Sequence, residues 1–178
     1  MPHAVTHFLI PVILLELFRH FFVKDKESFP IHYVFIGGLA GLLPDFDMIP
    51  YFILGLFGFS IQGIHRTFTH NLFFPSLFLI CAGFFHNFKN KWLGKYHLHL
   101  EDIFLVIAFG VFIHILLDAI VCGAILPFYP FSEFSFGLNL VKMVPESLQE
   151  SILPTIDAVL LILWMVSLEI RHKISEFI

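Results

Sequence analysis

The sequence predicts an all-α protein, a polytopic bundle of about five transmembrane helices with short re-entrant or interfacial segments between them. Apolar residues make up 58% of the chain and charged residues 13%, and the mean hydropathy is +0.87. Soluble domains contain roughly 45–50% apolar and about 25% charged residues. Because each span needs about 20 apolar residues, we expect residues 1–178 to form a single integral-membrane domain without a separate soluble part.

Six apolar runs mark the expected helices, and the distribution of Lys and Arg indicates which of them cross. The runs are residues 4–23, 31–43, 48–60, 72–88, 102–120 and 153–170. If the third run does not cross, eight Lys and Arg residues share one side of the membrane and only Arg66 and Lys142 lie opposite. If it crosses, the split is five against five. The positive-inside rule therefore favours five spans, with the C-terminus cytoplasmic and the N-terminus outside.

The first run is expected to be a helix that stays in the membrane, and the second to be a short one. Glu16 interrupts the first run and no small-residue cleavage site follows it, which argues against a removable signal peptide. Residues 31–43 would span about 20 Å as a helix, against a hydrocarbon core of about 30 Å. Pro44 should end that helix and leave the next residues on a turn. A neighbouring helix should approach closely along its glycines, Gly37, Gly38 and Gly41.

The later runs carry clear start and break signals. Thr69 or Asn71 is suited to cap a helix that begins before Pro75. Residues 119–150 contain prolines and glycines among aromatic side chains, so they should form an interfacial or re-entrant segment bordering an entrance from the membrane. Asp157 is expected in the first turn of the last helix, where a negative charge meets the positive end of the helix dipole.

Three short segments place imidazoles and carboxylates inside this apolar chain. They are Leu43-Pro44-Asp45-Phe46-Asp47, His65-Arg66-Thr67-Phe68-Thr69-His70 and His114-Ile115-Leu116-Leu117-Asp118. An ionisable group among lipid-facing helices costs several kcal/mol unless it is paired, hydrated or bound to an ion. The five-span topology brings all three segments to the same non-cytoplasmic end of the bundle. We therefore expect one outward-facing site.

The chemistry of these residues indicates a metal centre. His114 and Asp118 are four residues apart, so both stand on one face of a helix and could share an ion. Imidazoles with carboxylates and no thiolate suit Zn²⁺, Mn²⁺ or Fe²⁺. Cys81 and Cys122 lack the spacing of a disulfide or thiolate site. Local ion pairs and an Asx turn or helix cap at Asp47 are the simpler alternatives.

The ordered set of motifs resembles the YdjM-type family, whose members are described as LexA-regulated, inner-membrane metal-dependent hydrolases. The likeness rests on Thr6-His7, the three segments above and Tyr129-Pro130-Phe131. The chain departs from the family pattern at supporting positions, with Thr67 in place of glycine, Asn71 in place of serine and Val121 in place of threonine. The resemblance implies seven metal ligands: His7, Asp45, Asp47, His65, His70, His114 and Asp118.

We therefore expect a membrane-embedded metal-dependent hydrolase that cleaves an ester or phosphoester in a lipid-like or phosphorylated substrate, with one or two divalent ions, Zn²⁺ or Mn²⁺. Arg66 should steady anionic charge and Asp47 move a proton, and Thr69 is the third candidate catalytic residue. An ion or proton transporter and a scaffold with a structural metal are the alternatives. The net charge of −4 argues against a nucleic-acid partner, and the oligomeric state stays open.

Overall fold

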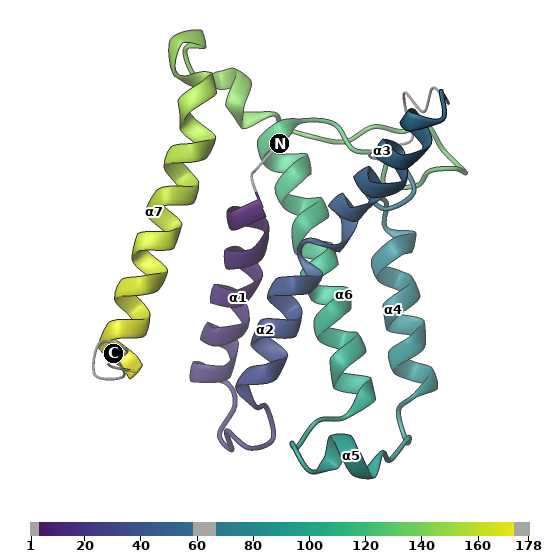
Figure 1. Cartoon of the computed structure of the whole chain (residues 1–178), viewed down its shortest axis with the longest axis vertical. Coiled ribbons are helices and arrows are strands. Elements are labelled where there is room, and N and C mark those ends of the chain that lie inside the picture. The colour runs from purple at the N-terminus through teal and green to yellow at the C-terminus, as the bar shows by residue number, and fades with distance from the viewer. Residues whose placement is uncertain (1–3, 59–66, 173–178) are drawn as a thin grey trace.

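The structure, a computed structural model, describes residues 4–58 and 67–172, and its regular elements there are helices (Figure 1). In chain order they are α1 (Ala4–Phe21), α2 (Ile31–Ala40), η1 (Leu43–Asp47), α3 (Met48–Leu56), α4 (Phe73–Phe84), α5 (Lys91–Gly94), α6 (Leu100–Leu117), η2 (Asp118–Cys122), η3 (Leu140–Met143) and α7 (Glu146–His172). In the described part of the chain, extended pairing is limited to one isolated bridge between Ile125 and Phe136. The all-α prediction is confirmed.

Fewer helices than predicted are long enough to cross a membrane. Three qualify by length and apolar composition within the described residues, at Ala4–Phe21, Leu100–Cys122 and Glu146–Ile170. A fourth is added if α2 and the segment Leu43–Leu56, which bend by 42° at their junction, are counted as one span. The 12 residues of α4 reach only about 18 Å. These are fewer than the five or so transmembrane helices predicted, because α2 and α4 stop early.

The long helices nevertheless alternate in direction through the bundle. Figure 1 shows α1 running toward the end that holds α5, α2 running back, and α4, α6 and α7 continuing the alternation. Helix α6 packs against α4, α2 and α1, whereas α7 packs against α1. The start of α1 and the end of α7 therefore lie at opposite ends of the molecule, as an odd number of passes requires.

Glycine contacts bring α1, α2 and α6 close together, as the sequence predicts for the second apolar run. A Cβ atom added to Gly110 of α6 would collide with the carbonyl oxygen of Gly37 of α2. One added to Gly41, just after α2, would collide with the carbonyl oxygen of His7 of α1. Backbone therefore touches backbone at both crossings, and side chains on all three helices are drawn toward one axis.

The outer surface of the bundle is apolar. Large side chains stand far out of the protein interior, for example Phe84 of α4 at 82% exposure and Ile170 of α7 at 76%. Soluble monomers rarely expose contiguous apolar patches larger than a few hundred Å². The two cysteines, Cys81 and Cys122, are free and half-buried. A surface of this kind is suited to contact with lipid.

The connection between α6 and α7 is irregular, as predicted, but the last helix begins earlier than expected. Residues 123–139 join η2 to η3 through the bridge at Ile125, and α7 starts at Glu146 rather than near residue 153. Pro145 precedes the helix and Glu146 supplies a negative charge in its first turn, which together favour a start there. The placement of Asp157 in a first turn is therefore wrong, since this residue lies well inside α7.

Candidate metal centre

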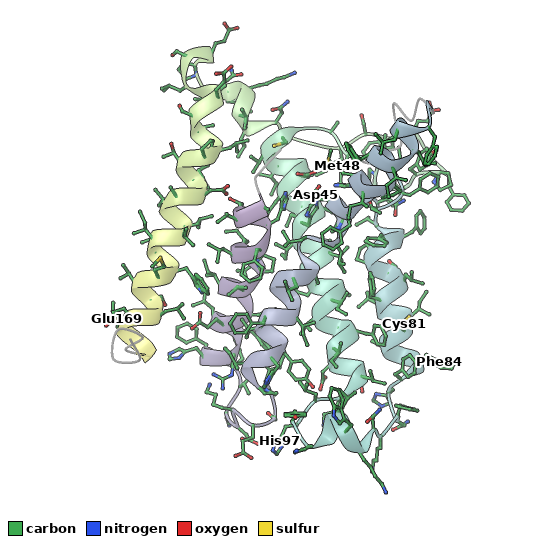
Figure 2. The ribbon with its side chains drawn as sticks, in the orientation of Figure 1. Asp45, Met48, Cys81, Phe84, His97 and Glu169 are labelled. Atoms are coloured by element: carbon green, nitrogen blue, oxygen red, sulfur yellow. The ribbon has the colours of Figure 1, made fainter. Side chains whose placement is uncertain are left out.

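Five ionisable side chains from separate parts of the chain meet at one end of the bundle. They come from α1, η1, the segment before α4, α6 and η2: His7, Asp45, His70, His114 and Asp118. The three imidazoles and Asp118 are fully buried, whereas the side chain of Asp45 is 28% exposed. Figure 2 shows Asp45 near the end where α1 begins and His97 at the opposite end. The structure thus brings residues from all three sequence segments to one place.

The polar atoms of these side chains lie in mutual contact. Nε2 of His70 is 3.2 Å from Nε2 of His114 and 3.6 Å from Oδ1 of Asp45 and from Oδ2 of Asp118. Nε2 of His114 is also 3.6 Å from Oδ1 of Asp45. Nε2 of His7 is 3.5 Å from Oδ1 of Asp118, and the His7 ring stacks on His114 with centroids 3.7 Å apart. Nitrogen and oxygen atoms of five side chains therefore face one small volume.

A hydrogen bond to the backbone sets the proton position on His114. Its Nδ1 atom lies 2.6 Å from the carbonyl oxygen of Gly41. A carbonyl oxygen can only accept, so Nδ1 carries a proton and donates it, and in the neutral ring Nε2 presents a lone pair to the cluster. The close approach of α2 to α6 supplies this acceptor, because Gly41 follows the last turn of α2.

A second chain of hydrogen bonds does the same for His70. The Thr69 hydroxyl donates to Oδ2 of Asp47 at 2.9 Å, and its oxygen lies 3.0 Å from Nδ1 of His70. A hydroxyl has one proton and an ionised carboxylate only accepts, so the Thr69 oxygen is left to accept from Nδ1 of His70. In the neutral ring Nε2 of His70 then also presents a lone pair. Oδ2 of Asp47 lies 3.7 Å from Nδ1 of His70, the ring nitrogen that faces away from the cluster.

Two imidazole nitrogens 3.2 Å apart, next to two carboxylates, form an arrangement that a cation would stabilise. With both rings neutral their lone pairs would face each other, and the two carboxylates carry two negative charges in an apolar bundle. Among the described residues, neither ring nitrogen of His7 has a hydrogen-bond partner, and Oδ1 of Asp45 has none either. A divalent cation would accept the lone pairs and offset the charge.

The spacing of these atoms also fits a metal ion. Ligands at about 2.1 Å from Zn²⁺ stand about 3.0 to 3.4 Å apart in octahedral to tetrahedral geometry. The contacts in the cluster range from 3.2 to 3.6 Å. Two groups have ligand atoms within 4.8 Å of one another: His7, His114 and Asp118, and Asp45, His70 and His114. The donor set of nitrogen and oxygen suits Zn²⁺ and Mn²⁺ alike.

Local backbone features explain how the chain presents these side chains. Pro44 lies in the first turn of the 3-10 helix η1, which carries Asp45, and α6 passes into the π-helical turn η2 at Asp118. Single π turns within helices are frequent at functional sites, because the wider turn re-aims the side chains that follow. Asn71 caps α4 by accepting from the backbone N–H groups of Phe73 and Phe74, as the sequence suggested. That cap holds the residue before it, His70, at the start of α4.

Comparison with known families fits this arrangement. The sequence pattern of the YdjM inner membrane protein family matches residues 1–174. The chain belongs to this family. No curated protein and no solved structure matches it. Membership of the YdjM family accords with the apolar outer surface described above and identifies the chain as an inner membrane protein.

In this YdjM-family protein the structure brings five of the seven predicted ligands together and places a sixth, Asp47, outside the cluster. Asp47 lies beyond His70, against its outer nitrogen, and Thr69 links the two. His65 and the predicted catalytic residue Arg66 lie outside the described residues. The sequence interpretation missed the carbonyl oxygen of Gly41 as a partner of His114. The glycine-rich end of α2 was the only local signal that a backbone acceptor would come so close.

Proposed function

We propose that the cluster binds a single divalent ion, Zn²⁺ or Mn²⁺, and that the protein hydrolyses an ester or phosphoester bond in a lipid-like substrate. The observation that carries the proposal is the pair of buried Nε2 atoms of His70 and His114, which lie 3.2 Å apart beside two carboxylates. One ion fits better than two, since Nε2 of His114 belongs to both possible ligand groups and has one lone pair to give.

The surrounding residues have separate roles in this proposal. A divalent ion supplies Lewis-acid chemistry there, acidifying a water molecule and polarising the scissile group. Thr69 and Asp47 orient the His70 ring through its outer nitrogen, as carboxylates commonly do for histidine ligands. Asp45 is suited to hold or move a proton, because its side chain borders both the cluster and the outside. Arg66 would hold an anionic part of the substrate in its guanidinium fork.

Substrate is proposed to reach the centre from the side of Asp45. This carboxylate is the exposed member of the cluster, and the nearby side chains of Phe46 and Phe68 are 53% and 57% exposed. An amphiphile could place its polar group at Asp45 and its apolar part against these rings. In this proposal the centre faces the outer side of the membrane, since six described Lys and Arg residues lie at the other end, in or beside the α1–α2 and α4–α6 connections: Arg19, Lys24, Lys26, Lys89, Lys91 and Lys95.

Metal content tests the first half of the proposal. Purified wild type is expected to carry about one equivalent of Zn²⁺ or Mn²⁺ by mass spectrometry, because five donor atoms are preorganised to bind an ion. Asp118→Ala and His70→Ala should each lose most of it, since each removes a ligand and leaves the others unbalanced. Equal and negligible metal in all three proteins would overturn the metal centre.

Hydrolysis tests the second half. Wild type loaded with Zn²⁺ or Mn²⁺ in vesicles of mixed phospholipids should release products detectable by lipid mass spectrometry, and His114→Ala should not. A metal-loaded wild type that releases no product and moves no ions would favour a structural metal instead. Cation or proton flux into liposomes would favour transport, which needs a pathway to both faces of the membrane.

A further inference from the structure

The carboxylate of Asp157 is anomalous in its surroundings. It sits in α7 between Ile156 and Ala158, within the candidate span Glu146–Ile170, which contains an 18-residue window of mean hydropathy 2.0. Its side chain is 9% exposed and is the most buried of the described side chains of that helix. A carboxylate in such a place needs a partner, and one that is this well buried is held there by specific contacts.

The partner of Asp157 is the first turn of α1. Oδ1 accepts a hydrogen bond from the backbone N–H of Thr6 at 3.0 Å and another, shorter one from the Thr6 hydroxyl. Thr6 is the third residue of α1, where the backbone N–H groups have no acceptor within the helix. The positive end of the helix dipole also favours a carboxylate at this position. Asp157 therefore caps α1 from another helix.

This cap adjoins the metal centre, because His7 is the next residue. The other two imidazoles of the cluster are oriented by their own hydrogen bonds, His114 to Gly41 and His70 to Thr69. Among the described residues His7 has no hydrogen bond at either ring nitrogen. Its ring position is therefore set by stacking on His114, by the 3.5 Å contact of Nε2 with Asp118 and by the backbone that carries it. That backbone is the turn held by Asp157.

We propose that Asp157 is a positioning residue of the metal centre, which fixes the first turn of α1 and so aims the His7 ring at the ion. The proposal rests on the metal centre of the proposed function. It makes metal affinity depend on the docking of α7, a helix that packs against α1 and contributes no side chain to the cluster. By linkage, metal binding should favour the docked position of α7 to the same extent.

The test is a double-mutant cycle on metal affinity with the full-length protein in detergent. Zn²⁺ dissociation constants are measured by competition with a chromogenic chelator for wild type, Asp157→Leu, His7→Ala and the double variant. Asp157→Leu should weaken Zn²⁺ binding about 10-fold, the range typical of residues that orient metal ligands. In the His7→Ala background it should have almost no further effect, since the ligand through which Asp157 acts is gone.

Matched variants separate positioning from general damage. Asp157→Asn keeps an oxygen acceptor and should recover most of the affinity lost in Asp157→Leu, and Thr6→Ser should bind more tightly than Thr6→Val. Glu150→Gln removes another carboxylate of α7, one that is exposed, and should leave the affinity unchanged. The absorption spectrum of bound Co²⁺, a stand-in for Zn²⁺, should change in Asp157→Leu as it does in His7→Ala, since both disturb the same ligand.

The outcomes distinguish this inference from the proposed function. A wild type that binds none of Zn²⁺, Mn²⁺ and Co²⁺ overturns both. A wild type that binds Zn²⁺, with an equal loss from Asp157→Leu whether or not His7 is present, overturns the positioning role alone. If Asp157→Leu does not yield folded protein, the same cycle with Thr6→Val in place of Asp157→Leu decides the question, because that change keeps the backbone bond to Asp157.

Discussion

At the scale of single residues, the hydrogen bonds at Nδ1 of His114 and His70 determine what the Nε2 atoms of these rings offer to the cluster. Gly41 accepts from Nδ1 of His114, and Thr69 accepts from Nδ1 of His70. In both cases the neutral ring turns the lone pair of Nε2 toward the cluster, where it is suited to a metal ion. His7 lacks such a bond among the described residues and depends on its backbone instead. The three imidazoles therefore differ in how they are held, although all three are buried.

Removal of the Thr69 hydroxyl should weaken metal binding. Thr69→Val breaks the chain from Asp47 to His70 and should lower Zn²⁺ affinity about 10-fold, whereas Thr69→Ser keeps the hydroxyl and should stay within about 2-fold of wild type. Chelator competition on the purified protein measures both. Thr155→Val, which removes an exposed hydroxyl bonded to the Ser151 carbonyl, serves as the control. Wild-type affinity in Thr69→Val would show that His70 is oriented without this hydroxyl.

At the scale of helices, close backbone contact between α1, α2 and α6 is what brings the ligands together. These helices cross where Gly41 meets His7 and where Gly110 meets Gly37. Larger residues at either crossing would push the helices apart and move His7 and His114 away from the cluster. Glycines, which have no side chain, thus position the ligand-bearing helices α1 and α6 and the Gly41 carbonyl oxygen that accepts from His114.

The glycine crossing should be sensitive to a single methyl group. Gly110→Ala places a Cβ against the carbonyl oxygen of Gly37 and should destabilise the protein by roughly 1–3 kcal/mol through overpacking. Gly83→Ala in α4 has no neighbour within 4 Å of the added Cβ, so it should be neutral or stabilise by up to about 1 kcal/mol through helix propensity. Thermal unfolding in detergent compares the two. Equal melting temperatures would mean that α2 and α6 do not cross at these glycines.

At the scale of the whole molecule, the alternating helices give it two chemically different ends. The end where α1 begins carries the metal centre, and the end with α5 carries most of the basic residues (Figure 1). Three helices are long enough to span a bilayer by themselves, and α2 and α4 are not. The bent pair of α2 with Leu43–Leu56 therefore matters for the topology, because its ionisable turn falls at the break and meets α6 there rather than lipid.

Opposite ends of the bundle should be accessible from opposite sides of the membrane. With Cys81 and Cys122 replaced by serine, Lys142→Cys should react with an impermeant maleimide added to the outside of intact cells. Lys91→Cys in α5 should react only after the membrane is opened. Both lysines are exposed, so accessibility of the side chain itself is matched. Reaction of Lys91→Cys in intact cells would reverse the proposed orientation, and a cysteine at position 62 would report on the region outside the described residues.

The sequence was most informative where the chemistry is local. The i, i+4 spacing of His114 and Asp118 predicted a shared helix face, and the structure has both side chains in one cluster. Glycines at 37, 38 and 41 predicted a close helix approach, which the crossings confirm. Helix lengths were harder to predict from the sequence, since an apolar run continues through a turn without a change in composition. For that reason the runs beginning at 31 and 72 were expected to be longer than α2 and α4 are.

The sequence by itself determined that the chain is an all-helical membrane protein of the YdjM family with imidazoles and carboxylates in fixed segments. Only the tertiary structure decided which of those groups meet and which stand behind them. Asp47 stands behind His70, and Asp157 reaches Thr6 across 151 residues of chain. Hydropathy and spacing report on a residue's own helix, whereas these contacts depend on how separate helices pack, which is set by many weak interactions over the whole bundle.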